Sequence, residues 1–207
     1  MNEVKLVLLG SEGAGKSAVL VRFLTKRFIG EYASNTWKLS AVRCTSKRLS
    51  IDGRQLNLEI FDPCSQNMEN ICILEEPVDW ADGFVVVYTI NDRVSFLYAE
   101  NILHQIRARR REACKGDVDV PICLVGNKQD LCHSRQVSDE EGRSLALEHK
   151  CIFQEVSAAE NYLDIANLFT RLIRHVMDHR SERRRYSGSK SMTKLINNMF
   201  GKRRKSV

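Results

Sequence analysis

Short runs of apolar residues recur along the chain and predict the strands of a sheet. Val4–Leu9 is apolar apart from Lys5, and Gly83–Ile90, Pro121–Val125 and Cys151–Val156 are further runs of this kind. Continuous apolar runs of this length are typical of strands that are buried on both faces of a mostly parallel sheet. We therefore expect four such strands.

Two more strands are predicted to pair as an antiparallel hairpin. Leu49–Ile51 and Leu56–Phe61 alternate apolar and polar residues on either side of Asp52 and Gly53. An Asp-Gly pair between alternating segments is the strongest short-range hairpin signal, because both residues accept the positive φ of a tight turn.

Segments with helical spacing of apolar residues separate these strands. The predicted helices are Ser17–Lys26, Val94–Arg111, Ser138–His149 and Tyr162–His179. Ser138 and Glu141 have the Ser-x-x-Glu spacing of a capping box, which marks the start of the third helix. Strands that alternate with helices predict a doubly wound α/β domain around a mostly parallel sheet.

Length and composition limit the number of domains. The chain has 207 residues, and at about 150 residues per domain this favours one domain, residues 1–179, with a C-terminal extension, residues 180–207. No apolar run is long enough to span a bilayer, and the first residues are too short for a signal peptide, so we expect a cytoplasmic chain. Seven cysteines without a Cys-x-x-Cys pair fit neither a disulfide framework nor a zinc ribbon.

The positive charge is concentrated at the C-terminus. Residues 180–207 contain ten Lys and Arg and one Glu, a balance of +9, whereas the rest of the chain has 22 basic and 25 acidic residues, or −3. Arg180–Ser191 is rich in Arg, Ser, Gly and Lys and is predicted to be a flexible linker. The apolar residues that follow have the spacing of one helical stripe: Met192, Leu195, Ile196, Met199 and Phe200.

This tail leaves several interpretations open. A basic amphipathic helix binds an anionic membrane surface, a calmodulin-like groove or an import receptor, and solvated disorder is the alternative. The chain ends Lys-Ser-Val without a prenylation cysteine, so we expect a non-prenylated protein. Its expected location is cytoplasmic, with the nucleus and a membrane periphery as alternatives.

His175 and His179 have the spacing of a metal pair, but no third ligand is evident, and we interpret them as surface histidines.

A phosphate-binding loop follows the first predicted strand. Gly10 to Ser17 matches G-x-x-x-x-G-K-[ST] at every fixed position and lies between a strand and a helix, where its mechanism requires it. Backbone N–H groups of such a loop face phosphate oxygens, Lys16 reaches the β and γ phosphates, and Ser17 binds Mg²⁺. The predicted nucleotide contacts here are Gly10, Ser11, Glu12, Gly13, Ala14, Gly15, Lys16, Ser17 and Ala18.

Two later loops predict which base is bound. Asn127-Lys128-Gln129-Asp130 follows an apolar strand, at the sheet edge where open α/β sheets bind ligands. The Asp130 carboxylate can accept two hydrogen bonds from guanine, a pattern that adenine does not offer. The segment Ser157-Ala158-Ala159 follows the last strand and can bring a backbone N–H to the guanine O6. The order of these three motifs predicts guanine-nucleotide binding.

With these motifs, residues 3–178 resemble a Ras-family small GTPase. The resemblance implies a P-loop NTPase fold with six strands and five helices, GTP or GDP with Mg²⁺ in the pocket, and Phe28 against the edge of the base. Without the resemblance, the core is the favoured interpretation of Phe28. Val21–Phe28, Trp80–Tyr88 and the basic tail are most similar to the growth-inhibitor branch of this family.

The switch segments depart from the family pattern. Asp62-Pro-Cys-Ser-Gln66 stands in place of the family's D-T-A-G-Q, which implies that Asp62 holds Mg²⁺ through water and Gln66 orients the attacking water. Ser65 replaces a glycine whose N–H normally turns onto the γ-phosphate, and its Cβ restricts that movement. Asn35 stands at the register of the Mg²⁺-binding threonine. The predicted metal ligands are thus Ser17, Asp62 and Asn35.

Glu12 stands where most Ras relatives have glycine. A carboxylate about 5 Å from a phosphate charge is repelled by roughly 3 kcal/mol at an effective dielectric constant of 20, unless it turns into solvent. Its bulk also crowds the catalytic water, so either orientation predicts poor hydrolysis.

The combined interpretation is a monomeric guanine-nucleotide switch with slow GTP hydrolysis, in which Gln66 positions water and Lys16 stabilises charge. Effector or regulator proteins are expected to contact Tyr32–Trp37 and Ser65–Asp79, and no specific nucleic acid is expected. The alternatives are a pseudo-GTPase that binds nucleotide without appreciable hydrolysis, an ATP-dependent phosphotransferase, and an adaptor that acts through its tail.

Overall fold

The computed structural model describes residues 2–28, 42–63, 80–113 and 120–201. Its elements in chain order are β1 (Asn2–Leu9), α1 (Lys16–Thr25), β2 (Val42–Ile51), β3 (Arg54–Pro63), β4 (Gly83–Thr89), α3 (Arg93–Ala113), β5 (Ile122–Asn127), η3 (Gln129–Ser134), α4 (Asp139–Glu148), β6 (Ile152–Glu155) and α5 (Tyr162–Gly201). The alternation predicted from the sequence is confirmed within these ranges.

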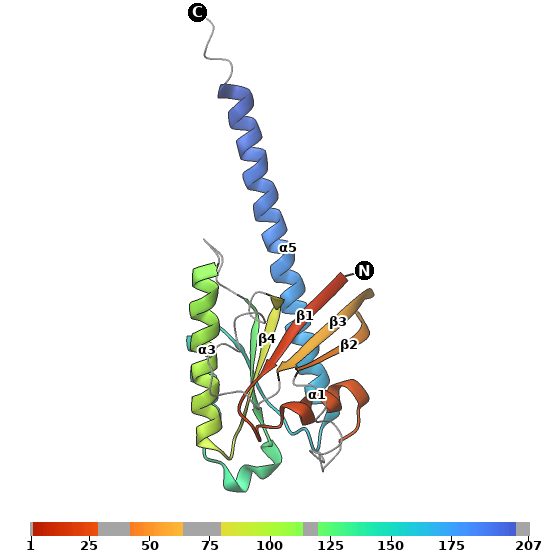
Figure 1. The fold of residues 1–207 in the computed structure, drawn as a ribbon, viewed down its shortest axis with the longest axis vertical. Helices are drawn as coiled ribbons and strands as arrows, with labels where there is room; N and C mark the ends of the chain where they lie inside the picture. The colour runs from red at the N-terminus through yellow and green to blue at the C-terminus, as the bar shows by residue number, and fades with distance from the viewer. Residues whose placement is uncertain (1, 29–41, 64–79, 114–119, 202–207) are drawn as a thin grey trace, which may run out of the picture.

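The strands form one six-stranded sheet in the order β2-β3-β1-β4-β5-β6. β2 is antiparallel to β3, and every other neighbouring pair is parallel. The hairpin turns at Asp52 and Gly53, whose φ angles are 52° and 74°, as the Asp-Gly pair predicts. The doubly wound P-loop fold is therefore confirmed, with five helical segments in the described part of the chain (Figure 1).

Two hydrophobic cores cover the two faces of the sheet. Successive residues of β1 point to opposite faces, so Leu6 and Leu8 pack in the core under α1 and α5, whereas Val7 and Leu9 pack in the core under α3 and α4. Phe23 of α1 stacks on a phenylalanine of α5 with 4.0 Å between the ring centroids. Both faces of the central strands are thus buried, which explains their continuous apolar runs.

Helix α4 begins as the capping box predicts. The Ser138 hydroxyl accepts a hydrogen bond from the Glu141 N–H, and the Glu141 carboxylate accepts one from the Ser138 N–H. These hydrogen bonds lower the pKa of Glu141, with the Ser138 N–H as the main cause. Because the backbone N–H groups of Ser138 and Glu141 both have hydrogen-bond partners within this four-residue segment, the local sequence defines where the helix begins.

The predicted linker at Arg180–Ser191 is wrong. Helix α5 continues to Gly201 without a break and projects well beyond the sheet (Figure 1). The segment has no proline and only one glycine, and Arg and Lys favour helices, so a helix already formed over the core can continue through it. Side chains are described as far as Arg183, and the apolar stripe predicted further on lies outside them. Among the described residues, no helix is long and apolar enough to cross a bilayer.

Candidate functional site

The predicted site loops meet at one edge of the sheet. β1, β5 and β6 run in the same direction, so the loops that follow them emerge together at the lower end of the molecule in Figure 1. These loops contain the phosphate-binding motif after Leu9, the Asn127–Asp130 motif and the Ser157–Ala159 motif. The edge is the usual ligand position of open α/β sheets.

The glycines of the first loop have conformations and surroundings that exclude a side chain. Gly10 has a φ of 145°, and a Cβ built on it would lie 2.1 Å from the Val87 carbonyl oxygen of β4. Gly15 has a φ of 87°, and its Cβ would lie 2.3 Å from Nδ2 of Asn127. The backbone can therefore curl against the sheet and against the Asn127–Asp130 loop only because these positions lack a Cβ.

The N-terminus of α1 is open to an anion. Gly15 is its N-cap and supplies no side-chain hydrogen bond, and the first turn contains no acidic residue. Lys16 is buried, and its ammonium group donates hydrogen bonds of 2.8 Å to the carbonyl oxygens of Gly10 and Ser11. The loop thus holds a cation beside the N-terminus of α1, an arrangement suited to phosphate.

A cavity of about 230 Å³ lies beside this loop. It is lined by Gly15, Ala18, Phe28, Asn127, Lys128, Asp130, Leu131, Ala158 and Ala159. Eight of these nine were predicted as nucleotide contacts, and the structure brings them together from three loops, from α1 and from the segment just after α1. Leu131 is the exception. Its position directly after Asp130 is the only signal in the sequence that could have found it.

Asn127 ties the three loops together. Its side chain is 1% exposed. Its Nδ2 donates to the Ala14 carbonyl oxygen over 2.9 Å, and its Oδ1 accepts from the Ala158 N–H over 3.3 Å. Because both ends of the amide are engaged with the backbone, Asn127 positions the loops around the cavity.

Asp130 is oriented by the neighbouring loop. The Ser157 hydroxyl, 3% exposed, donates to Oδ1 of Asp130 over 2.6 Å. One carboxylate oxygen is thereby held, in a residue that lines the cavity. The Gln129 N–H also donates to the Val156 carbonyl oxygen, which holds the two loops side by side.

A bidentate ion pair connects the segment that follows η3 to the end of β6 and so holds the same two loops together. Arg135 follows η3 and donates to both oxygens of Glu155, over 2.7 and 2.8 Å. The Glu155 side chain is only 6% exposed, and its hydrogen bonds raise the pKa of Arg135. Sequence reasoning did not find this pair, because the two residues belong to elements that are separated in the sequence by α4.

Two of the three predicted metal ligands are in the described residues. Ser17 lies in the first turn of α1, and Asp62 lies at the end of β3 and is buried. β1 and β3 are parallel neighbours, so both positions lie at the same edge of the sheet as the phosphate-binding motif. Hydroxyl and carboxylate oxygens are the donors that Mg²⁺ prefers. Asn35, Gln66 and the segments Tyr32–Trp37 and Ser65–Asp79 lie outside the described residues.

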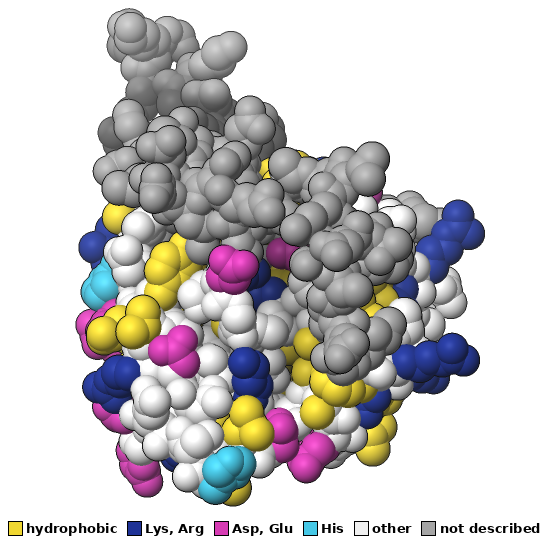
Figure 2. Space-filling view, turned by 60° about the horizontal axis from the view of Figure 1, so that its bottom comes forward, with side chains coloured by type: hydrophobic (Ala, Val, Ile, Leu, Met, Phe, Trp, Pro, Cys, Tyr) yellow, Lys and Arg dark blue, Asp and Glu magenta, His cyan; other side chains and the backbone are white. Residues whose placement is uncertain are grey.

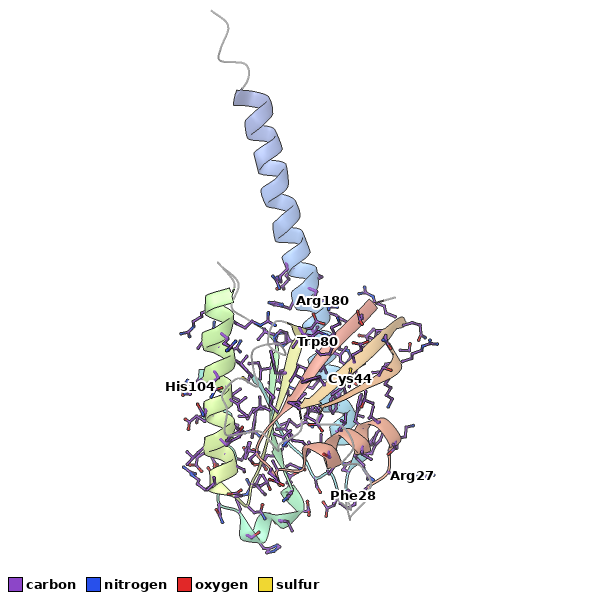
Figure 3. The ribbon with its side chains drawn as sticks, viewed as in Figure 1. Arg27, Phe28, Cys44, Trp80, His104 and Arg180 are labelled. Atoms are coloured by element: carbon purple, nitrogen blue, oxygen red, sulfur yellow. The ribbon has the colours of Figure 1, made fainter. Side chains whose placement is uncertain are left out.

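Phe28 and Glu12 are both at the surface of this edge. Phe28 is 40% exposed and lines the cavity beyond the end of α1 (Figure 3), so it is not the core residue that one interpretation predicted. Glu12 is exposed, which favours the orientation into solvent and a screened interaction with phosphate. Figure 2 turns this edge toward the viewer, and acidic and basic side chains are interspersed on it.

Comparison with known proteins identifies the family to which this chain belongs. A model of the Ras family matches residues 5–178. The chain belongs to the Ras family of small GTPases. It is 55% identical to the Ras-related and estrogen-regulated growth inhibitor-like protein of Bos taurus, over the full length of both chains. It is 52% identical to the human protein of that name, over 92% of this chain and 91% of the relative.

A more distant relative within the Ras family is also similar. The mouse Ras-like protein family member 11A is 41% identical, over 89% of this chain and 76% of that protein. The resemblance inferred from the motifs is therefore confirmed, both for the family and for its growth-inhibitor branch. Ras family members in general are GTPases that bind GTP and GDP. The roles of individual residues in this chain stay predictions.

Proposed function

We propose that this chain is a guanine-nucleotide switch that binds GDP and GTP with Mg²⁺, hydrolyses GTP slowly and thereby controls a protein partner. The observation that carries the proposal is the cavity in which Asp130, held by Ser157, faces the glycine loop around Lys16. A carboxylate fixed on one side accepts the two adjacent donors of guanine, and the loop with its helix N-terminus receives the phosphates.

The proposed roles follow from the chemistry of each group. Lys16 offsets charge that develops on the phosphates, and Ser17 and Asp62 are the oxygen donors that would hold Mg²⁺. When bound, Mg²⁺ supplies neutralisation of phosphate charge. Gln66 is proposed to orient the attacking water, because hydrolysis in this family depends mainly on positioning and electrostatics. Asn35 is the proposed third metal ligand in the GTP-bound form.

The proposed selection of guanine can be tested by replacing one carboxylate oxygen of Asp130 with an amide nitrogen. Asp130→Asn should weaken GDP binding at least tenfold, about 1.4 kcal/mol, because the new amide N–H opposes a guanine donor. The same variant should gain affinity for xanthosine diphosphate, whose carbonyl at position 2 accepts from the amide. Titrations with labelled nucleotides measure both constants.

Asp178→Asn, on the exposed part of α5, is the matched control and should bind GDP as the wild type does. The guanine assignment would be wrong if labelled GDP showed no saturation or if ATP competed as well as GTP. Loss of GDP binding without any gain for the xanthine nucleotide would argue against the role of Asp130.

Hydrolysis is expected near or below the slow intrinsic rate of small GTPases, about 10⁻⁴ s⁻¹. Single-turnover release of γ-phosphate measures it. Glu12→Gly should raise the rate, and Glu12→Gln separates the two causes, since it keeps the bulk and removes the charge. A wild-type rate of the order of one per second would contradict the expectation, and undetectable release would favour the pseudo-GTPase, for which Glu12 and Ser65 are the motivating departures.

We further propose that the tail attaches the protein reversibly to an anionic surface, with cytoplasmic protein as the unattached form. The support is the +9 charge of residues 180–207 and the spacing of the apolar stripe. Salt should weaken attachment, and so should neutralisation of Lys202–Lys205. Leu195→Asp should matter only if the stripe inserts into a bilayer or a groove. If neither change alters sedimentation with anionic vesicles or imaging in cells, the attachment proposal fails.

A further inference from the structure

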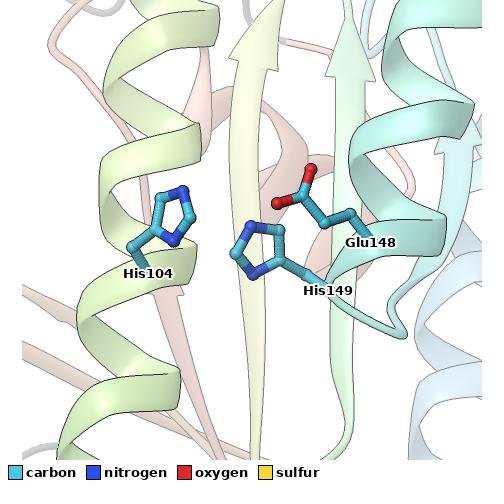
Figure 4. Close-up of side chains that lie close together, drawn as sticks. All are labelled: His104, Glu148 and His149. Carbon is cyan, nitrogen blue, oxygen red and sulfur yellow. The ribbon is translucent and has the colours of Figure 1, made fainter.

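Three side chains that bind metals in other proteins converge between α3 and the end of α4. They are His104, Glu148 and His149, and one ligand atom from each lies within 4.8 Å of the others (Figure 4). The two imidazole rings meet edge to face, with 4.5 Å between their centroids. His104 and Glu148 are exposed, and His149 is buried.

His149 has an unused ring nitrogen in this cluster. Its side chain is 6% exposed, and Nε2 is buried without a hydrogen-bond partner among the described residues. A buried polar atom that lacks a partner is unfavourable, because it has lost its water without a replacement. In Figure 4 the His149 ring faces both the Glu148 carboxylate and the ring of His104. The nitrogen therefore lies where an ion shared by all three would bind.

The backbone around His149 is held rigidly. His149 is the C-cap of α4, and its N–H donates to the Leu145 carbonyl oxygen over 3.1 Å. Arg107 of α3 is buried and donates from Nε to the His149 carbonyl oxygen, also over 3.1 Å. Arg107 lies three residues after His104 on the same helix face, so this contact fixes the separation of the backbone segments that carry the two histidines.

The charges around the pair suit a cation. The neutral imidazole ring is a common metal ligand. Glu148 adds a carboxylate. The Arg107 guanidinium is the opposing charge, but its N–H groups are directed to the carbonyl oxygens of His149 and Val120.

We propose that His104, Glu148 and His149 bind one Zn²⁺ ion, which links α3 to α4. Two imidazoles with one carboxylate form a set of protein ligands typical of zinc, with the fourth position left for water. Ligand atoms around one tetrahedral Zn²⁺ lie about 3.3 Å apart. The exposed His104 and Glu148 side chains can close the remaining distance by changing rotamer, whereas the buried His149 stays in place.

This site is separate from the nucleotide cavity and goes beyond the proposed switch function. His149 lies shortly before Ile152, where β6 begins, and the cavity lies where the strands end. Figure 3 shows His104 on α3, on the other side of the molecule from Phe28. The site therefore does not depend on whether the cavity binds guanine nucleotides.

The test uses the full chain, stripped with EDTA and returned to excess Mg²⁺. Competition of the protein with a chromophoric chelator for Zn²⁺ should give one site per chain with a dissociation constant in the micromolar range or below. His104→Gln and Glu148→Gln should each weaken binding at least tenfold. Both positions are exposed, so the variants should keep the circular dichroism spectrum and urea midpoint of the wild type. Co²⁺ should give the visible absorption bands of a tetrahedral site in the wild type and not in these two variants.

Two matched substitutions serve as controls. His175→Gln removes an exposed histidine of α5, and Glu140→Gln removes an exposed carboxylate of α4; neither should change Zn²⁺ affinity. Absence of saturable Zn²⁺ binding by the wild type would overturn the proposal. So would affinities of His104→Gln and Glu148→Gln within twofold of the wild type, or an equal loss in His175→Gln, which would place the ion on α5.

Discussion

At the scale of single residues, the site depends on positions where a side chain would not fit. Gly15 combines a left-handed φ with a close approach to Asn127, the residue that ties the three loops together. Gly53, in the hairpin turn, has a similar φ of 74° but open space around it. A comparison of substitutions at the two glycines therefore separates the effect of a strained φ angle from the effect of a clash between the added Cβ and a neighbouring residue.

We predict that Gly15→Ala and Gly53→Ala both lose about 1–2 kcal/mol of unfolding free energy through the strained φ. Gly15→Ala should in addition lose at least tenfold in GDP affinity, about 1.4 kcal/mol, because its Cβ displaces the Asn127 amide. Urea denaturation measures the stability and a labelled-GDP titration the affinity. Equal GDP affinity in the two variants would show that the Asn127 contact does not organise the site.

At the scale of elements, the loops around Asp130 and Ser157 are joined by the pair between Arg135, after η3, and Glu155, at the end of β6. Removal of one partner leaves the other charge poorly solvated. Arg143 and Asp139 form a second Arg–carboxylate pair on α4, with side chains 67% and 40% exposed. A pair of this kind in solvent contributes little to stability.

Arg135→Ala should therefore lower the free energy of unfolding by about 2 kcal/mol, less than the roughly 3–5 kcal/mol typical of a fully buried pair, because Arg135 itself is partly exposed. Arg143→Ala should lose less than about 1 kcal/mol. Addition of Glu155→Gln to Arg135→Ala should restore part of the loss, since the uncompensated charge is gone. Similar losses in the two single variants would mean that burial of Glu155 does not matter. Urea denaturation measures all four proteins.

At the scale of the whole molecule, α5 has two different parts. Its first turns bury Ile165, Phe169 and Val176 in the core against the sheet. Further along, Arg180 pairs with Asp82 at 2.5 Å, near the N-terminal end of β4. Beyond this point the helix projects away from the sheet (Figure 1).

Deletion of residues 184–207 should leave the unfolding free energy unchanged within the 10–15% uncertainty of urea extrapolation, because the buried residues of α5 are kept. The same deletion should abolish sedimentation with anionic vesicles, and GDP binding should stay unchanged. A large loss of stability would show that the projecting part of α5 contributes to the fold. Persistent vesicle binding would place the attachment surface on the domain.

The sequence by itself determined the order of strands and helices, the hairpin, the capping box and the three nucleotide motifs. Each of these is encoded over a few neighbouring residues, in the period of apolar positions or in the φ angles that Gly and Asp accept. The same local patterns were sufficient to identify the Ras family. They were not sufficient for Arg180–Ser191, because composition resembles a linker there while the preceding helix lets the backbone continue as a helix.

Only the tertiary structure decided which distant residues meet. The hydrogen bonds of Asn127 to Ala14 and Ala158, the pairing of Arg135 with Glu155, the exposure of Phe28 and the convergence of His104 with Glu148 and His149 all join separate elements. The physical reason is that these contacts depend on how helices pack on the two faces of the sheet. Packing is set by many weak apolar contacts together, and no single motif encodes it.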